Sequence, residues 1–137
     1  MVILDASVVY KWFAKNEEDS SIALNILQRH MQGREKIVVP DLILYELTNA
    51  WVTKTAIPFI RVKVNLKDLQ DASLKIESPT FDLAVEAATF AKKYKTSVYD
   101  AYYLILARKK KCNFITADNR LLNQVSLPFV KRLKDYK

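Results

Sequence analysis

The sequence predicts an α/β domain in which a short, mainly parallel β-sheet is flanked by α-helices, giving three α/β/α layers. Short apolar runs alternate along the chain with longer segments of helical periodicity. Half of the residues are hydrophobic, and a chain of 137 residues can form one well-packed core but is too short for two. No repeat, low-complexity tract or linker divides the chain, so we expect a single domain over residues 1–137.

The first part of the chain predicts two buried strands, each followed by a helix. These elements are expected at residues 1–4, 17–30, 36–40 and 42–54. The continuous apolar strands are typical of a parallel sheet that is covered on both faces. Gly33 ends the first helix, Asp41 is expected to cap the second, and Pro58 marks a break behind it. Residues 56–64 favour no single structure.

The second part predicts four helices and two strands. The helices are expected at residues 65–76, 78–95, 97–111 and 117–124, and the strands at 113–116 and 128–133. Asn65 opens the first of these helices, and Pro79 is expected in the first turn of the second. Ser97 and Asp100 match the S-x-x-D capping box at the start of the third. Strands that alternate with helices are joined by crossovers, which make neighbouring strands parallel.

Composition narrows the chemistry that the chain can perform. Lysine and arginine total 22 against 15 acidic residues, a net charge of +7 that suits a polyanionic partner. Cys112 is the only cysteine, which excludes an internal disulfide and a thiolate-rich zinc site. His30 is the only histidine, which excludes catalysis by a histidine pair. The N-terminal apolar stretch has no basic leader and is interrupted by Asp5, so we expect no membrane segment and a cytoplasmic location.

Four acidic residues are expected to meet at one edge of the sheet. They are Asp5, Glu46, Asp100 and Asp118. Asp5 and Asp118 follow strands and lie at the carboxyl edge, where open α/β folds build their sites. Glu46 is only about 7.5 Å along a helix that starts at this edge. The helix of Asp100 leads back into the strand at 113–116, so it must begin at the same edge.

Each of these acids also has a local explanation. Asp100 fits a capping box, Asp118 fits a helix cap, and Asp5 fits a turn. Glu46 has no lysine or arginine three or four residues away, which leaves only a distant basic partner. Two carboxylates ~4 Å apart repel by ~4 kcal/mol at an effective dielectric of about 20, which exceeds the contribution of a cap. A cluster therefore needs cations or protons, and an all-oxygen site selects Mg²⁺ or Mn²⁺.

The segments around these acids resemble the motifs of a known family. They read ILDASVVYKWF, PDLILYELTNAW, SVYDAYYLILA and FITADNRLL. In this order and spacing they are similar to PIN-domain ribonucleases, particularly the VapC-like toxins of toxin/antitoxin pairs. The resemblance implies a PIN-like fold and an endoribonuclease that uses one or two Mg²⁺ or Mn²⁺ ions. It also implies catalytic and metal-binding roles for Asp5, Glu46, Asp100 and Asp118, and supporting polar roles for Ser7 and Thr116.

The resemblance further implies partners. VapC-like proteins typically form homodimers and bind an antitoxin, and residues 53–75, which match the family least, commonly shape these contacts and the substrate groove. If the four acids are left out of the count, the chain has 11 acidic residues and 22 basic ones. This excess of positive charge suits an RNA substrate. Lys11, Lys15 and Arg120 follow Asp5 and Asp118 in sequence and are the candidates for binding the RNA backbone. The basic run at 108–111 ends ~16 Å along its helix from the acids, too far to bind the same phosphate.

Two other classes of protein remain as alternatives. One is a PIN-like subunit that keeps the acids but binds RNA or an assembly without turnover. The other is phosphoryl transfer to aspartate, as in haloacid-dehalogenase-like phosphatases or receiver domains. This class fits poorly, because Asp5 is followed by Ala6 and Ser7, without the Asp-x-Asp or acidic pair that such proteins carry.

Overall fold

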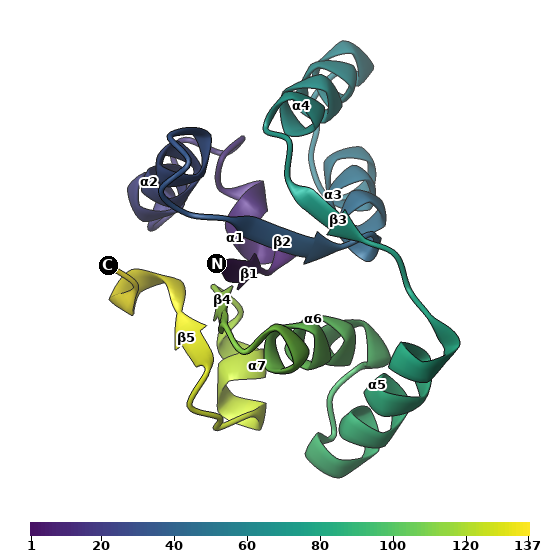
Figure 1. The fold of residues 1–137 in the computed structure, drawn as a ribbon. Helices are drawn as coiled ribbons and strands as arrows, with labels where there is room; N and C mark the ends of the chain where they lie inside the picture. The colour runs from purple at the N-terminus through teal and green to yellow at the C-terminus, as the bar shows by residue number, and fades with distance from the viewer.

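The computed structural model describes residues 1–137 and contains five strands, seven α-helices and one 3₁₀ turn (Figure 1). The strands are β1 (Val2–Leu4), β2 (Ile37–Pro40), β3 (Lys75–Glu77), β4 (Asn113–Thr116) and β5 (Val130–Arg132). The helices are α1 (Ala6–Tyr10), α2 (Ser20–Met31), α3 (Leu42–Thr53), α4 (Phe59–Asp71), α5 (Phe81–Tyr94), α6 (Val98–Lys110) and α7 (Asn119–Gln124). The 3₁₀ turn η1 (Leu133–Asp135) follows the last strand.

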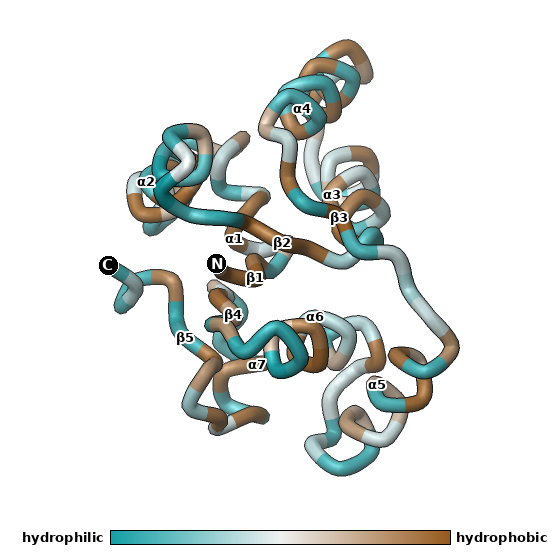
Figure 2. Tube along the Cα trace, in the orientation of Figure 1, coloured by the Kyte–Doolittle hydropathy of each residue, from teal (hydrophilic) through white to brown (hydrophobic).

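The sheet is parallel throughout, with the strand order β3-β2-β1-β4-β5. The first strand, β1, is central: Ile3 pairs with Val38 of β2 on one side and with Phe114 of β4 on the other. Every residue of β1 and β2 is buried, as their continuous apolar runs predict. Figure 2 shows these two strands as a hydrophobic band in the middle of the fold.

The connections between strands create a switch point in the middle of the sheet. The chain moves from β1 to β2 to β3 in one direction, then returns to β4 and moves on to β5 in the other. Helices α1 to α4 lie on one side of the sheet and α5 to α7 on the other (Figure 1). Neighbouring strands whose connections diverge in this way leave a crevice at their carboxyl ends. In this sheet that crevice lies between β1 and β4.

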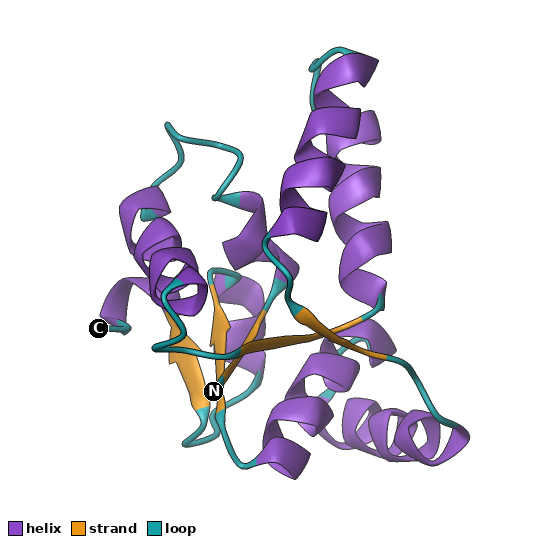
Figure 3. Ribbon diagram, turned by 45° about the horizontal axis from the view of Figure 1, so that its top comes forward, coloured by secondary structure: helices purple, strands orange, loops and turns teal.

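Helix α6 is the most deeply buried helix. Residues 103–107 are buried without interruption, since the sheet covers one side of the helix and α5 packs against the other. Figure 3 shows the strands enclosed between helices on both sides, the three layers that the sequence predicts. Neither α6 nor any other helix is long and apolar enough to cross a membrane.

The first error of the sequence prediction concerns α4. Residues 56–64 favour no single structure in the sequence, and Asn65 is predicted to open a helix, but α4 begins at Phe59 and buries Asn65 in its middle. The β-branched residues Ile60, Val62 and Val64 recur at every second position, which weakens the helical pattern. Burial of one face of the helix against the protein overrides this local preference.

The second error concerns β3, which occupies residues predicted to end the helix 65–76. The helix stops at Asp71 because Ser73 adopts a left-handed conformation with φ of 54°. The following strand contains only three residues, of which Lys75 and Ile76 are exposed. An exposed edge strand of this length carries no continuous apolar run, so the pattern that identified β1 and β2 does not apply to it.

Some of the predicted helix caps are confirmed by the structure, and others are wrong. The Ser97 hydroxyl and the Asp118 carboxylate accept backbone hydrogen bonds at the starts of α6 and α7, as predicted. Asp41 makes no side-chain capping bond, because its backbone is already helical and its carboxylate does not turn back onto α3. Pro79 lies outside α5 instead of in its first turn, and Thr80 forms the cap by accepting the Leu83 N–H.

The only histidine has a structural role in the fold. His30 lies near the end of α2, where Nδ1 accepts the Ile37 N–H at 3.3 Å and Nε2 donates to the Ala72 carbonyl at 3.0 Å. These bonds connect α2 to β2 and to the end of α4. His30 therefore satisfies backbone groups on the opposite side of the sheet from α6 and is absent from the acidic cavity described below.

Candidate active site

A cavity of ≈ 330 Å³ opens at the switch point, and all four of the predicted acidic residues line it. Asp5 directly follows β1, Glu46 lies in the second turn of α3, Asp100 lies in the first turn of α6, and Asp118 caps α7. Four segments that are distant in sequence thus contribute one carboxylate each. The convergence follows from strand order, since β1 and β4 are neighbours and the helices begin at their carboxyl ends.

Asp5 is the most firmly held of the four acids. Its side chain is 7% exposed, and Oδ2 accepts hydrogen bonds of 2.6 Å from both the Ser7 and Thr116 hydroxyls. Burial raises the pKa of Asp5, the two hydroxyls oppose this rise, and the nearby carboxylates of Asp100 and Asp118 raise the pKa further. Both of these hydrogen bonds go to Oδ2, so Oδ1 keeps its lone pairs for a ligand.

The two hydroxyls beside Asp5 have a defined direction of donation. Ser7 Oγ accepts the Ala117 N–H and Thr116 Oγ1 accepts the Asp118 N–H, each at 3.0 Å. Their hydroxyl hydrogens therefore both point to Asp5 Oδ2. This network fastens the end of β1 to the end of β4 and stabilises the ionised form of Asp5.

Glu46 is half-buried and takes part in no ion pair. Burial raises its pKa to about 8, and the negative charges of Asp5 and Asp100 contribute to the rise. The Tyr103 hydroxyl and the Lys54 ammonium lower the pKa in part, but Lys54 is not within ion-pair distance. A carboxyl group with this pKa keeps its charge at neutral pH only when a cation compensates it.

Asp100 and Asp118 each lie at the start of a helix and also line the acidic cavity. Asp100 donates its backbone N–H to Ser97 Oγ at 3.0 Å, so half of the predicted capping box is present. Burial raises the pKa of the Asp100 carboxyl, and Asp118 raises it further, whereas Ser97 and Arg120 lower it. Asp118 Oδ1 accepts the N–H groups of Arg120 at 2.8 Å and Leu121 at 3.3 Å. Capping uses one Asp118 oxygen and leaves the other for the cavity.

The donor set of the cavity suits a hard divalent cation. All six ion pairs of the protein involve other residues, so none of the four carboxylates is neutralised by lysine or arginine. The ligands that they offer are oxygens only, as Mg²⁺ and Mn²⁺ prefer. No three acidic, histidine or cysteine side chains are arranged to hold one ion together as they stand. An ion in this cavity would therefore take one or two carboxylates and complete its coordination with water, which is usual for Mg²⁺.

Comparison with known families agrees with this geometry, since the PIN domain family matches residues 2–126. The chain belongs to the PIN domain family. Comparison with curated protein sequences gives no match. Solved structures share the fold of this chain at low sequence identity.

Three solved structures illustrate the shared fold. PAE2754 from Pyrobaculum aerophilum is 21% identical, with a TM-score of 0.70, over 97% of this chain and 89% of that one. A toxin–antitoxin complex from Klebsiella pneumoniae contains a chain 15% identical, with a TM-score of 0.71, over 97% of this chain and 98% of that one. Mycobacterium tuberculosis VapC20, described as a sarcin–ricin loop cleaving toxin, is 14% identical, with a TM-score of 0.70, over 93% of this chain and 97% of that one.

The basic residues around the PIN domain's acidic cavity differ in part from those that the sequence indicated. Arg120 lies beside the acids and lines an adjoining hollow. Lys54, which the sequence reasoning missed, lines both this hollow and the acidic cavity, because α3 runs along the cavity instead of leading away from it. Lys11 pairs with Glu17 at 3.4 Å and lies outside both, as does the exposed Lys15.

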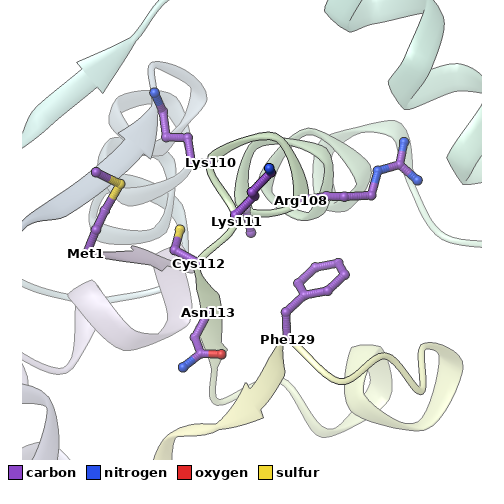
Figure 4. A pocket seen from close by; sticks show the side chains of 8 residues that line it. Met1, Arg108, Lys110, Lys111, Cys112, Asn113 and Phe129 are labelled. Carbon is purple, nitrogen blue, oxygen red and sulfur yellow. The ribbon is translucent and has the colours of Figure 1, made fainter.

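The basic run at the end of α6 lies at the opposite end of the sheet from the acids. Figure 4 shows the side chains of Arg108 and Lys110 pointing away from each other around a cavity of ≈ 470 Å³ next to Met1. Lys110 pairs with Glu77 at 2.9 Å, and Arg108 lies 3.9 Å from Glu86. These cations are engaged within the fold and are separated from the acidic cavity by the length of α6.

Proposed function

We propose that this PIN domain is a Mg²⁺- or Mn²⁺-dependent endoribonuclease. The observation that carries the proposal is the set of four carboxylates, none of them paired with a cation of the protein, around one cavity at the sheet's switch point. Family membership supports the same function, as does the similar fold of VapC20, which is described as a sarcin–ricin loop cleaving toxin. The excess of basic over acidic residues in the sequence, with a net charge of +7, suits an RNA substrate.

The residues of the chain divide the work of such a reaction. Asp5 and Asp100 would hold the ion, Asp118 would complete the site, and Glu46 would hold a water or a second ion. When bound, a divalent ion supplies Lewis acidity at the phosphate and lowers the pKa of coordinated water. The hydroxyls beside Asp5 keep its carboxylate charged and fixed in orientation.

Glu46 would orient the attacking water, because its carboxyl lies in the same cavity and is not held by a protein cation. Lys54 and Arg120 would bind the phosphates of the substrate on the open side of the cavity. Lys11 and Lys15 remain predictions for RNA contacts farther from the bond that is cut.

Metal-dependent cleavage of RNA tests the proposal directly. Purified protein should cut structured RNAs in the presence of Mn²⁺ or Mg²⁺, leaving 5′-phosphate and 3′-hydroxyl ends, and should be inactive with EDTA. The Asp5→Asn variant should lose cleavage, whereas Asp71→Asn, an exposed residue that pairs with Lys67, should retain it. RNA binding without cleavage by the wild-type protein would instead favour the alternative of a binding or assembly subunit.

We further propose that the protein is the toxin of a toxin/antitoxin pair and forms a homodimer. The similar fold in a toxin–antitoxin complex supports an antitoxin partner. An apolar hollow of ≈ 330 Å³ between α3, α4 and β3 offers a surface for protein contacts, and large apolar side chains of the same three elements are exposed. They are Leu44, Val52, Phe59, Ile60, Val64 and Ile76. Light scattering at micromolar concentration should give the mass of a dimer, and a monomer alone would contradict the homodimer.

A further inference from the structure

A second hollow extends the acidic cavity outward. Its volume is ≈ 610 Å³, and it shares Glu46, Asn49, Lys54 and Asp100 with the acidic cavity. Its other lining residues are Leu42, Tyr45, Ser97, Tyr99 and Arg120. A strand of substrate whose phosphate lies at the acids would therefore continue directly into this hollow, which we call the outer groove.

Two tyrosines on the outer groove present their rings to solvent. Tyr45 of α3 is 72% exposed and Tyr99 of α6 is 69% exposed, whereas Tyr103, one turn farther along α6, is fully buried. Neither exposed ring packs against another aromatic ring of the protein. Each tyrosine directly precedes an acid of the cavity, Glu46 or Asp100, so both rings lie on the helices that carry the candidate catalytic acids.

The cations of the outer groove are also free of partners. Lys54 and Arg120 form none of the protein's six ion pairs. Both lie close enough to the acids to lower their pKa values, Lys54 that of Glu46 and Arg120 that of Asp100. The outer groove therefore combines exposed aromatic rings with unpaired positive charges immediately beside the candidate catalytic acids.

We propose that Tyr45 and Tyr99 form a base-stacking subsite for one unpaired nucleotide next to the bond that is cut, with Lys54 and Arg120 binding its flanking phosphates. This inference rests on the proposed nuclease function and adds the substrate's local structure to it. Aromatic stacking requires an open face of the base, which a nucleotide within a duplex does not offer. The site consequently selects single-stranded segments and tolerates different bases, since every base has a π-face.

Charge and position favour a nucleic acid over a protein in this groove. Phosphate groups can pair with both cations, and bases can stack on both rings. The apolar hollow between α3, α4 and β3 carries no lysine or arginine on its lining and suits a protein partner better. The outer groove opens instead on the acids.

Binding to inactive protein separates the subsite from catalysis. The Asp5→Asn background prevents turnover, and fluorescence anisotropy with Mg²⁺ measures the affinity for a short unstructured oligouridine. Tyr45→Ala and Tyr99→Ala should each weaken binding by roughly 5- to 150-fold, while the corresponding phenylalanine variants should retain it. Phe81→Ala, which removes a ring that is 94% exposed on another helix, is the matched control and should have no effect.

Two further comparisons identify the groups that are recognised. An oligonucleotide with abasic positions should bind the wild-type and tyrosine variants equally weakly, because its bases are missing. Lys54→Gln should reduce the dependence of affinity on salt by about one counterion, whereas the tyrosine variants should leave the salt slope unchanged. Duplex RNA should bind more weakly than the single strand and should be insensitive to both tyrosine changes.

The possible failures are distinguishable. If wild-type protein cleaves RNA and the tyrosine variants bind and cleave as well as wild type, the subsite is wrong and the nuclease function stands. If no RNA is cleaved but binding depends on the tyrosines as expected, the nuclease function is wrong, and the tyrosines form a binding site for single-stranded RNA without adjacent cleavage. If the tyrosine variants change only the oligomeric state, the groove is a protein interface and the subsite is wrong.

Discussion

The Thr116 hydroxyl at the end of β4 donates a 2.6 Å hydrogen bond to Asp5 Oδ2 at the end of β1, across 111 positions of sequence. The same hydroxyl accepts the Asp118 N–H at 3.0 Å. One buried oxygen therefore positions two of the four acids. Through these two bonds, the pairing of β1 with β4 sets the positions of Asp5 and Asp118 in the cavity.

Replacing Thr116 with valine should damage both stability and activity. Valine keeps the shape of threonine but leaves Asp5 Oδ2 and the Asp118 N–H without this partner. We expect a loss of about 1–3 kcal/mol in the free energy of unfolding and roughly 10- to 100-fold in RNA cleavage. Urea denaturation and cleavage assays measure the two effects. Thr116→Ser keeps the hydroxyl and should recover most of the activity; equal damage by serine and valine would refute the role of the hydrogen bond.

The pKa of Glu46 predicts a pH-dependent stability of the metal-free protein. Its folded pKa is about 8 against an ordinary value of 4.5, so between these values the unfolded chain releases a proton that the folded protein keeps. The free energy of unfolding should therefore fall as pH rises from 4.5 to 8. Glu46→Gln cannot ionise and should be more stable than wild type at pH 8, by roughly 1–3 kcal/mol, since partial solvent exposure reduces the effect.

Urea denaturation in EDTA at several pH values tests this difference. Wild type and Glu46→Gln should converge in stability near pH 4, where both side chains are neutral. The exposed Glu18→Gln variant, whose side chain forms no ion pair, should follow the wild-type pH dependence throughout. A Glu46→Gln variant that is less stable than wild type at pH 8 would show that the ionised carboxylate is not costly.

The two uses of Asp118 can be separated by substitution. Asparagine keeps an oxygen that accepts the Arg120 and Leu121 N–H groups, so Asp118→Asn should retain stability to within about 0.5 kcal/mol. It removes a charge from the cavity and should reduce cleavage by ~100-fold or more. Asp118→Ala removes the cap as well and should cost a further ~1 kcal/mol in stability. If Asp118→Asn cleaves RNA at the wild-type rate, Asp118 is a cap and nothing more.

Divalent ions should stabilise the folded protein. Binding at a concentration 100 times the Kd adds about 2.7 kcal/mol to the free energy of unfolding, so Mn²⁺ should raise the Tm and EDTA should reverse the rise. The effect should weaken as pH falls, because protons compete with the ion for the carboxylates of Asp5, Glu46 and Asp100. The pKa values of all three groups are raised. Asp100→Asn should reduce the shift in Tm. An unchanged shift in this variant would place the ion elsewhere.

The sequence predicts the centre of the fold better than its periphery. The strands β1 and β2 are continuous apolar runs, and α6 begins at a serine cap, so local pattern and tertiary burial agree there. β3 was missed because it is short and exposed and gains its strand conformation only by pairing with β2. In a segment of three residues, pairing with a neighbouring strand produces no recognisable sequence pattern.

The acidic residues of the candidate site could be predicted from the sequence, whereas the basic residues around it could be predicted only in part. The acids lie directly at element boundaries, where parallel topology fixes their position without reference to side-chain conformation. Lys54 was missed because its placement depends on how α3 lies across the cavity, which strand order does not determine. The exposure of Tyr45 and Tyr99 was likewise not readable, since aromatic residues at helical spacing are usually part of a core.

The distance in sequence between β1 and β4 also bears on how the protein is made. Asp118 is synthesised more than a hundred residues after Asp5, and it lies beside β4, which must pair with β1. A chain without β4 lacks the Thr116 hydroxyl and the Asp118 carboxylate. The acidic cavity is therefore assembled only when β4 has paired with β1.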